Sequence, residues 1–210
     1  MLPFEIFHHP LSGRFFMRDN RERFLSLNGD AVKRQLKLRG VRGAKRQGEN
    51  MSDVDHVLAE CTHEASCEYA GPLAGHKAGV MKFKGNRVLV TDDPVIIKGE
   101  PRPFPMVEKV LTELFHVVDP AQMLHVFGWL HMARLMMKAG KPMPGQAFVM
   151  AGPRNCGKNL FQDLITEMLG GRMARPYRYM TGKSEFNADL FQAEHLMIAD
   201  EAPYQDIASR

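Results

Sequence analysis

The sequence predicts an α/β fold over residues 143–210, preceded by an α+β region over residues 1–100 and a small helical segment over residues 101–142. The first supporting observation is a short apolar run after residue 147, followed at once by a glycine-rich loop and an amphipathic helix. The second is another apolar run that ends in two acidic residues near the end of the chain. The third is a group of prolines at residues 101–105, which favours a stiff, extended connection between domains.

The glycine-rich loop has the composition of a phosphate-binding loop between a strand at residues 148–150 and a helix. Gly152 and Gly157 would let the backbone turn its N–H groups toward a polyphosphate, and Lys158 would reach the β- and γ-phosphates. We therefore predict an ATP site, part of a nucleotide-hydrolysing core of the P-loop kind with a parallel sheet. The predicted nucleotide-binding residues are Gly152, Pro153, Arg154, Asn155, Cys156, Gly157, Lys158 and Asn159.

The second apolar run, Leu196 to Ala199, predicts a strand that leads into Asp200 and Glu201. At a strand end, Asp200 would hold Mg²⁺ through water, and Glu201 would orient and deprotonate the attacking water. We therefore predict Lys158 and Glu201 as catalytic residues. Phosphate loops usually end in Ser or Thr, whose hydroxyl ligates Mg²⁺, so Asn159 predicts a weaker or water-mediated metal contact through its amide oxygen. The alternative is a strand that ends in solvated acids.

Composition limits the class of protein. With 44% hydrophobic and 25% charged residues, the chain can bury a core. Three cysteines are too few for a disulfide scaffold, and no charge-free apolar stretch reaches membrane-spanning length. We also find no signal-peptide pattern, and we expect a cytoplasmic protein without a membrane partner.

Basic residues are concentrated near the N-terminus. Residues 1–50 carry 11 Lys or Arg and 5 Asp or Glu, whereas the rest of the chain carries 17 and 19. This asymmetry fits either a polyanionic partner or a solvated basic face. Residues 175–183 also interleave Tyr177 and Tyr179 with bases, which fits single-stranded nucleic acid or a loop packed by its tyrosines.

Turn residues and hydrophobic periodicity predict the elements before the phosphate loop. They are a hairpin from residues 14–17 and 24–27, a helix capped by Asp30 with Val32 and Leu36 inward, a hairpin from residues 80–83 and 87–91, a strand at 95–97, and helices at 107–115 and 120–138. The last helix is apolar over most of its girth, which fits a buried core helix or a subunit interface. The His and Cys residues at 56, 61, 63 and 67 lack zinc-site spacing, so we do not assign a metal there.

Several of these motifs together resemble a known family. Residues 152–158, the run Phe186-Asn187-Ala188-Asp189-Leu190 and residues 196–202 are similar to the ATPase core of superfamily 3 helicases in phage and plasmid primase-helicase proteins. Residues 13–40 and 70–76 are similar, more loosely, to the region that precedes this core.

The resemblance implies an ATP- and Mg²⁺-dependent helicase that forms a homo-oligomeric ring, expected to be a hexamer, on single-stranded DNA in the host cytoplasm. Lys158 would contact phosphate, Asp200 would hold Mg²⁺ and Glu201 would act on water. The family core continues beyond the acidic pair to a sensor strand, a DNA-contacting hairpin and an arginine finger. Because nine residues follow Glu201, we expect a fragment whose parallel sheet is incomplete at the C-terminus.

Two other classes stay open from the sequence. A P-loop kinase would pass phosphate to an acceptor and has no need of a carboxylate placed on water, so the acidic pair argues against it. A replication module that binds nucleotide or DNA without hydrolysis would explain Asn159.

Overall fold

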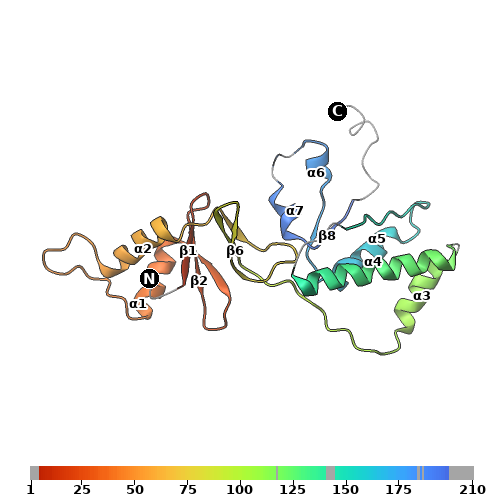
Figure 1. The fold of residues 1–210 in the computed structure, drawn as a ribbon, viewed down its shortest axis with the longest axis horizontal. Coiled ribbons are helices and arrows are strands. Elements are labelled where there is room, and N and C mark those ends of the chain that lie inside the picture. Colours follow the sequence, from red (N-terminus) through yellow and green to blue (C-terminus); the bar gives the residue numbers. More distant parts are fainter. Residues whose placement is uncertain (1–4, 117, 141–144, 184, 186, 199–210) are drawn as a thin grey trace. The chain divides into compact units, whose positions relative to one another are not determined.

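The computed structural model describes residues 5–116, 118–140, 145–183, 185 and 187–198, which form a mixed α/β structure with small sheets and seven helices (Figure 1). The chain divides into two compact units. Unit 1 contains residues 1–72 and 77–93, and unit 2 contains residues 73–76 and 94–210. The three-part division at residues 100 and 142 stays a prediction.

Unit 1 contains a three-stranded antiparallel sheet of β1 (Ile6–His9), β2 (Arg14–Arg18) and β3 (Phe24–Leu27), in that order. The predicted hairpin of β2 and β3 is confirmed. Its turn is held by the Asp19 carboxylate, which accepts hydrogen bonds from the backbone N–H groups of Arg21 at 2.8 Å and Arg23 at 2.9 Å. The short polar side chain thus closes the turn by bonding to its own backbone.

Two helices, α1 (Gly29–Leu38) and α2 (Asp53–Glu64), pack against one face of this sheet. As predicted, Val32 and Leu36 of α1 are fully buried, but the predicted cap is wrong. Asn28, not Asp30, accepts the hydrogen bond from the Ala31 N–H group, at 2.8 Å, because the helix begins one residue before Asp30. The core below the helices contains Ile6, Phe15, Met17, Val32, Leu36, Val54, Cys61 and Ala65.

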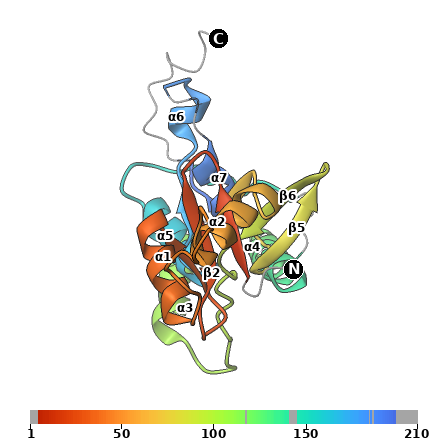
Figure 2. The ribbon, with the colours of Figure 1, turned by 90° about the vertical axis from the view of Figure 1, so that its left-hand side faces the viewer.

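The other face of the sheet packs against a second small sheet, which contains β4 (Tyr69–Gly71), β5 (Gly79–Phe83) and β6 (Asn86–Val90). The strand order is β4-β6-β5, with β4 parallel and β5 antiparallel to β6. Lys84 and Gly85 have φ angles of 48° and 88°, so both central turn residues are left-handed, as the twist of a tight hairpin requires. This second predicted hairpin is also confirmed (Figure 2).

Unit 2 is built from helices α3 (Pro105–Leu114), α4 (Pro120–Ala139), α5 (Lys158–Met168), α6 (Tyr177–Met180) and α7 (Ala188–Gln192). Asp119 caps α4 through the Ala121 N–H group, and Gly140, at a φ of 61°, ends it. The buried residues Val126, Met137, Phe161, Ile165 and Leu169 form the core between α4 and α5. None of the described helices is long and apolar enough to cross a membrane.

The predicted parallel sheet is represented, among the described residues, by a single two-stranded pair. This pair joins β7 (Met173–Ala174) to β8 (His195–Leu196). The strands predicted at residues 148–150 and 95–97 do not form, because no described strand lies beside either segment to supply ladder hydrogen bonds. Side chains hold the first segment instead: the rings of Phe148 and Trp129 lie 5.6 Å apart.

Candidate nucleotide-binding site

The predicted phosphate loop forms a tight turn directly before α5. Asn155 has a φ of 59° and Gly157 a φ of 92°, so the backbone turns through two left-handed residues before the helix begins at Lys158. A side chain at residue 157 would be strained, which explains the glycine. Residues 152–155 and Asn159 are exposed, whereas Cys156 and Lys158 are partly buried.

The Lys158 side chain folds back across this loop. Its Nζ donates hydrogen bonds to the carbonyl oxygens of Gly152, at 2.9 Å, and Pro153, at 2.8 Å, and lies 3.6 Å from Cys156 Sγ. The ammonium charge is therefore held against the loop backbone rather than extended into solvent. An anion bound in the loop would meet this charge directly.

The N-terminus of α5 is suited to an anion for a second reason. No side chain caps it, and its first turn contains no acidic residue. The first N–H groups of a helix have no partner within the helix and carry a partial positive charge. The N-terminus of α5 therefore adds to the field of Lys158 at the same loop.

The core of unit 2 fixes the position of the loop. The Phe161 ring, one turn into α5, contacts the rings of Phe115 at 5.2 Å and Phe148 at 5.8 Å. A Cβ atom at Gly157 would lie 3.2 Å from Leu114 Cδ1 of α3, so that helix packs closely against the base of the loop. The predicted helical segment thus supports the predicted phosphate loop.

The second predicted motif is described only up to its strand. The Met197 N–H group donates to Ala174 O at 2.9 Å, which extends the parallel ladder of β7 and β8 by one residue. Asp200 and Glu201 lie outside the described residues. Their roles, and that of Asn159 as a metal ligand, stay predictions.

A buried polar contact joins α5 to β8, and the sequence did not indicate it. Thr166 Oγ1 lies 2.6 Å from His195 Nδ1 and 3.0 Å from Gln162 O. Because the hydroxyl has one proton to give to the Gln162 carbonyl, the Nδ1–H group of His195 donates to Thr166 Oγ1. Burial lowers the pKa of His195 below its ordinary value of 6.5, while Asp163 opposes this shift. The only sequence signal was a histidine directly before an apolar run.

A second polar contact ties the segment before β8 to other parts of unit 2. Both guanidinium nitrogens Nε and Nη2 of Arg172 donate to the Glu194 carboxylate, and the Nε bond is 2.7 Å long. The Glu194 side chain is only 3% exposed, and it also accepts from the Gly75 N–H group at 3.3 Å. The turn at residues 73–76 is fixed in this way.

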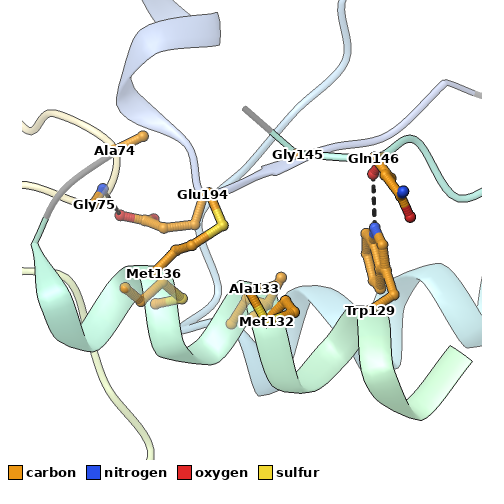
Figure 3. A pocket seen from close by; sticks show the side chains of 11 residues that line it. Ala74, Gly75, Trp129, Met132, Ala133, Met136, Gly145, Gln146 and Glu194 are labelled. Carbon is orange, nitrogen blue, oxygen red and sulfur yellow. Dashed lines mark hydrogen bonds between the residues drawn. The ribbon is translucent and has the colours of Figure 1, made fainter. Parts of the chain in front are cut away.

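A cavity of about 260 Å³ lies beside α4 (Figure 3). Trp129, Met132 and Met136 line it from the helix, and Glu194 and Gly145 line it from the facing segments. No residue of the 152–159 loop is among those that line it. The cavity is therefore separate from the phosphate loop.

The aromatic and basic segment at residues 175–183 forms the short helix α6 and the turn after it. Lys183 Nζ lies 5.4 Å from the centre of the half-buried Tyr177 ring, whereas Tyr179, Arg175 and Arg178 are exposed. The short helix α7 follows at Ala188–Gln192, and Ser184 and Phe186 lie outside the described residues.

Comparison with known proteins relates the chain to one set of solved structures. No protein-family model and no curated protein matches the sequence. An A form apo structure of the NrS-1 C-terminal region is 15% identical, with a TM-score of 0.52, and the match covers 91% of this chain and 42% of that chain. A second A form structure is 17% identical, with a TM-score of 0.54 and coverages of 94% and 44%. A further apo structure of this region is 15% identical, with a TM-score of 0.51, and the match covers 90% of this chain and 41% of that chain.

The chain thus spans between 41% and 44% of the length of these structures. At such low identity the likeness concerns the backbone arrangement. Nearly the whole of this chain shares its fold with part of the C-terminal region of NrS-1.

Proposed function

We propose that this chain carries the nucleotide-binding part of an ATP-driven, helicase-type motor of phage or plasmid DNA replication. The observation that supports the proposal most is the convergence of Lys158, the left-handed Gly157 and the uncapped N-terminus of α5 on one loop. The resemblance of the loop and the later motifs to the superfamily 3 helicase core adds support. The fold shared with the NrS-1 C-terminal region is consistent with a replication-related role.

In this proposal the loop binds the phosphates of Mg²⁺-ATP. Lys158 would exchange its bonds to the carbonyl oxygens of Gly152 and Pro153 for bonds to phosphate oxygens, which carry a negative charge and bind an ammonium group more strongly. Asp200 would hold Mg²⁺, Asn159 would contact it weakly, and Glu201 would act on water. The partners would be single-stranded DNA and further copies of the chain in a hexameric ring.

A second candidate is a replication module that binds nucleotide without hydrolysing it. The exposed Asn159 in the first turn of α5 favours it, because an amide replaces the hydroxyl that usually ligates Mg²⁺ there. Nucleotide binding is common to both candidates. Hydrolysis that depends on Glu201 distinguishes them.

The cysteines offer a direct test of nucleotide binding. Cys61 and Cys67 are buried, and burial raises their pKa values to about 12 and about 11, so they stay protonated and shielded at pH 8. Cys156 is partly exposed within the loop. Iodoacetamide should therefore alkylate Cys156 selectively in the folded protein, and ATP bound in the loop should block it.

With ATP at ten times its dissociation constant, the alkylation rate of Cys156, measured by mass spectrometry, should fall about eleven-fold, because only the unbound fraction reacts. Lys158→Ala should abolish this protection, whereas Lys109→Ala, on the exposed side of α3, should retain it. Glu201→Gln should keep the protection and lose any phosphate release. Alkylation that ATP does not slow in the folded wild type would refute the assignment of the loop.

A further inference from the structure

Unit 1 contains a strongly basic surface outside the candidate nucleotide site. α1 and the loop after it, residues 29–52, include seven Lys or Arg residues and two acidic residues, Asp30 in the first turn of the helix and Glu49 near the end of the loop. Burial of Val32 and Leu36 turns Lys33, Arg34 and Lys37 to the outer side of the helix, because these positions lie within one arc of a 3.6-residue turn.

The loop after α1 extends this surface. The Lys37 side chain passes over Gly43, so closely that a Cβ atom there would overlap Lys37 Cε. Two backbone contacts hold the loop to the start of α2: the Val54 N–H group donates to Arg42 O at 3.3 Å, and Lys45 forms a bridge with Ser52. Arg42 and Lys45 are therefore kept near Lys37.

Some of the seven bases are already engaged within unit 1. Lys33 pairs with Asp55 at 3.3 Å, Arg46 pairs with Asp53 at 3.2 Å, and Arg39 donates to Arg18 O at 2.9 Å. The other four are exposed and have no ion pair with any described residue. These four, Arg34, Lys37, Arg42 and Lys45, are called the α1 basic surface below.

We propose that the α1 basic surface binds the phosphate backbone of a nucleic acid strand. Several long cations without acidic partners suit a polymer that repeats one negative charge at each nucleotide, and such contacts bind without regard to base sequence. A membrane surface fits less well, because helices that lie on lipid insert a large apolar face. Here Val32 and Leu36 are buried in the core, Leu38 is the one large apolar side chain that α1 exposes, and residues 31–48 contain no aromatic side chain.

This interaction does not need ATP and does not rest on the proposed function of the phosphate loop. It assigns a nucleic-acid contact to unit 1, whereas the nucleotide site belongs to unit 2. If both proposals hold, Lys158→Ala should bind nucleic acid like the wild type while losing protection of Cys156. Failure of the proposed nucleic-acid contact would appear in the binding measurement, and failure of the proposed nucleotide site would appear in the protection of Cys156.

The test measures binding of the whole chain to a fluorescein-labelled oligothymidine and to a labelled duplex by anisotropy, without ATP, at several salt concentrations. The variant replaces Arg34, Lys37, Arg42 and Lys45 with Gln. Each phosphate contact contributes about 0.7 to the slope of log K against log salt for a single strand and about 0.9 for a duplex. Loss of four contacts should make the slope shallower by about 3. Between about 50 and 200 mM salt, the wild type should then lose roughly 50-fold more affinity for the single strand than the variant loses.

The control variant replaces Arg14, Lys77, Lys82 and Lys84 with Gln, which removes the same charge from other exposed positions of unit 1. It should keep the wild-type slope. The proposal is overturned if the slope of the control becomes as shallow as that of the variant, because the protein would then attract nucleic acid through its net charge and not through the α1 basic surface. It is also overturned if the folded wild type binds phosphatidylserine vesicles but neither oligonucleotide, or binds none of these probes.

Discussion

Phe161 offers the sharpest test of how the core of unit 2 supports the predicted phosphate loop. Its side chain is 2% exposed, and its ring makes an edge-on contact with Phe115 at an interplanar angle of 85°. The ring also contacts Phe148, from the segment that leads into the loop. Because Phe161 lies three residues after Lys158, Phe161→Ala should loosen the helix that carries the site.

The expected loss in free energy of unfolding depends on the burial of Phe161 and on the segments to which its neighbours Phe115 and Phe148 belong. Removing a buried Phe ring costs about 3–5 kcal/mol, because a cavity adds to the lost burial. The two ring contacts are each worth about 0.5–1.5 kcal/mol within that total. Since Phe115 and Phe148 belong to different segments, they cannot both move inward without shifting backbone, and we expect the cavity to persist. At a urea m-value of about 2 kcal/mol/M, the midpoint should fall by roughly 1.5–2.5 M.

Trp129 provides the assay because it is the only tryptophan in the chain and lies in the same core. Its ring packs on Phe148, and its Nε1 donates to Gln146 O at 2.8 Å, so unfolding of unit 2 should change its emission. Phe127→Ala is the matched control: the ring is 47% exposed on α4, and its removal should cost about 1 kcal/mol or less.

A shift for Phe161→Ala no larger than that of Phe127→Ala would refute the reasoning. If Phe161→Ala does not fold, Phe161→Leu, which keeps most of the volume, should cost about 1–2 kcal/mol and serve in its place.

Three further predictions use the same site region. Burial lowers the pKa of His195 in the folded state, so only the unfolded chain takes up a proton as pH falls below about 6.5. The free energy of unfolding, followed by Trp129 emission, should therefore decline from that pH toward the lowered pKa. His195→Asn should remove this decline. Arg172→Met should cost about 3–5 kcal/mol by leaving the buried Glu194 carboxylate unpaired, while the further change Glu194→Gln should restore much of the loss in urea titrations. Asn159→Thr should hold or strengthen Mg²⁺-dependent ATP binding in calorimetry, and a large loss would show that the amide itself is used.

Local sequence signals predicted the elements whose hydrogen bonds close over short distances. Lys84 and Gly85 specify a tight hairpin, and Pro120 after Asp119 specifies the start of a helix, because each depends on the conformation of a few adjacent residues. The capping box of Ser52 and Asp55 is a comparable local signal for the start of α2, a helix that we did not predict.

The strands that did not form show where local signals are insufficient. Val95 to Ile97 is a β-branched run, yet a strand also needs a neighbour, and its contacts are made with helices and loops instead. Arg134 of α4 donates to Ile97 O at 2.7 Å, and Gly170 lies so close to Val95 O that a Cβ atom there would be 2.5 Å away. These partners are distant in sequence, so periodicity could not indicate them.

In β8, a buried pair of polar residues can determine a strand register that hydrophobicity alone does not specify. Leu196, Met197 and Ile198 are all apolar, so a shift of one residue would exchange the buried and exposed faces with little change in apolar burial. In the observed register His195 and Met197 are buried, whereas Leu196 and Ile198 are exposed. A one-residue slip would carry the imidazole of His195 away from Thr166 Oγ1, so the slipped register would lose this buried hydrogen bond, which is worth about 0.5–1.5 kcal/mol. The contact between His195 and Thr166 therefore favours the observed register of β8 against β7.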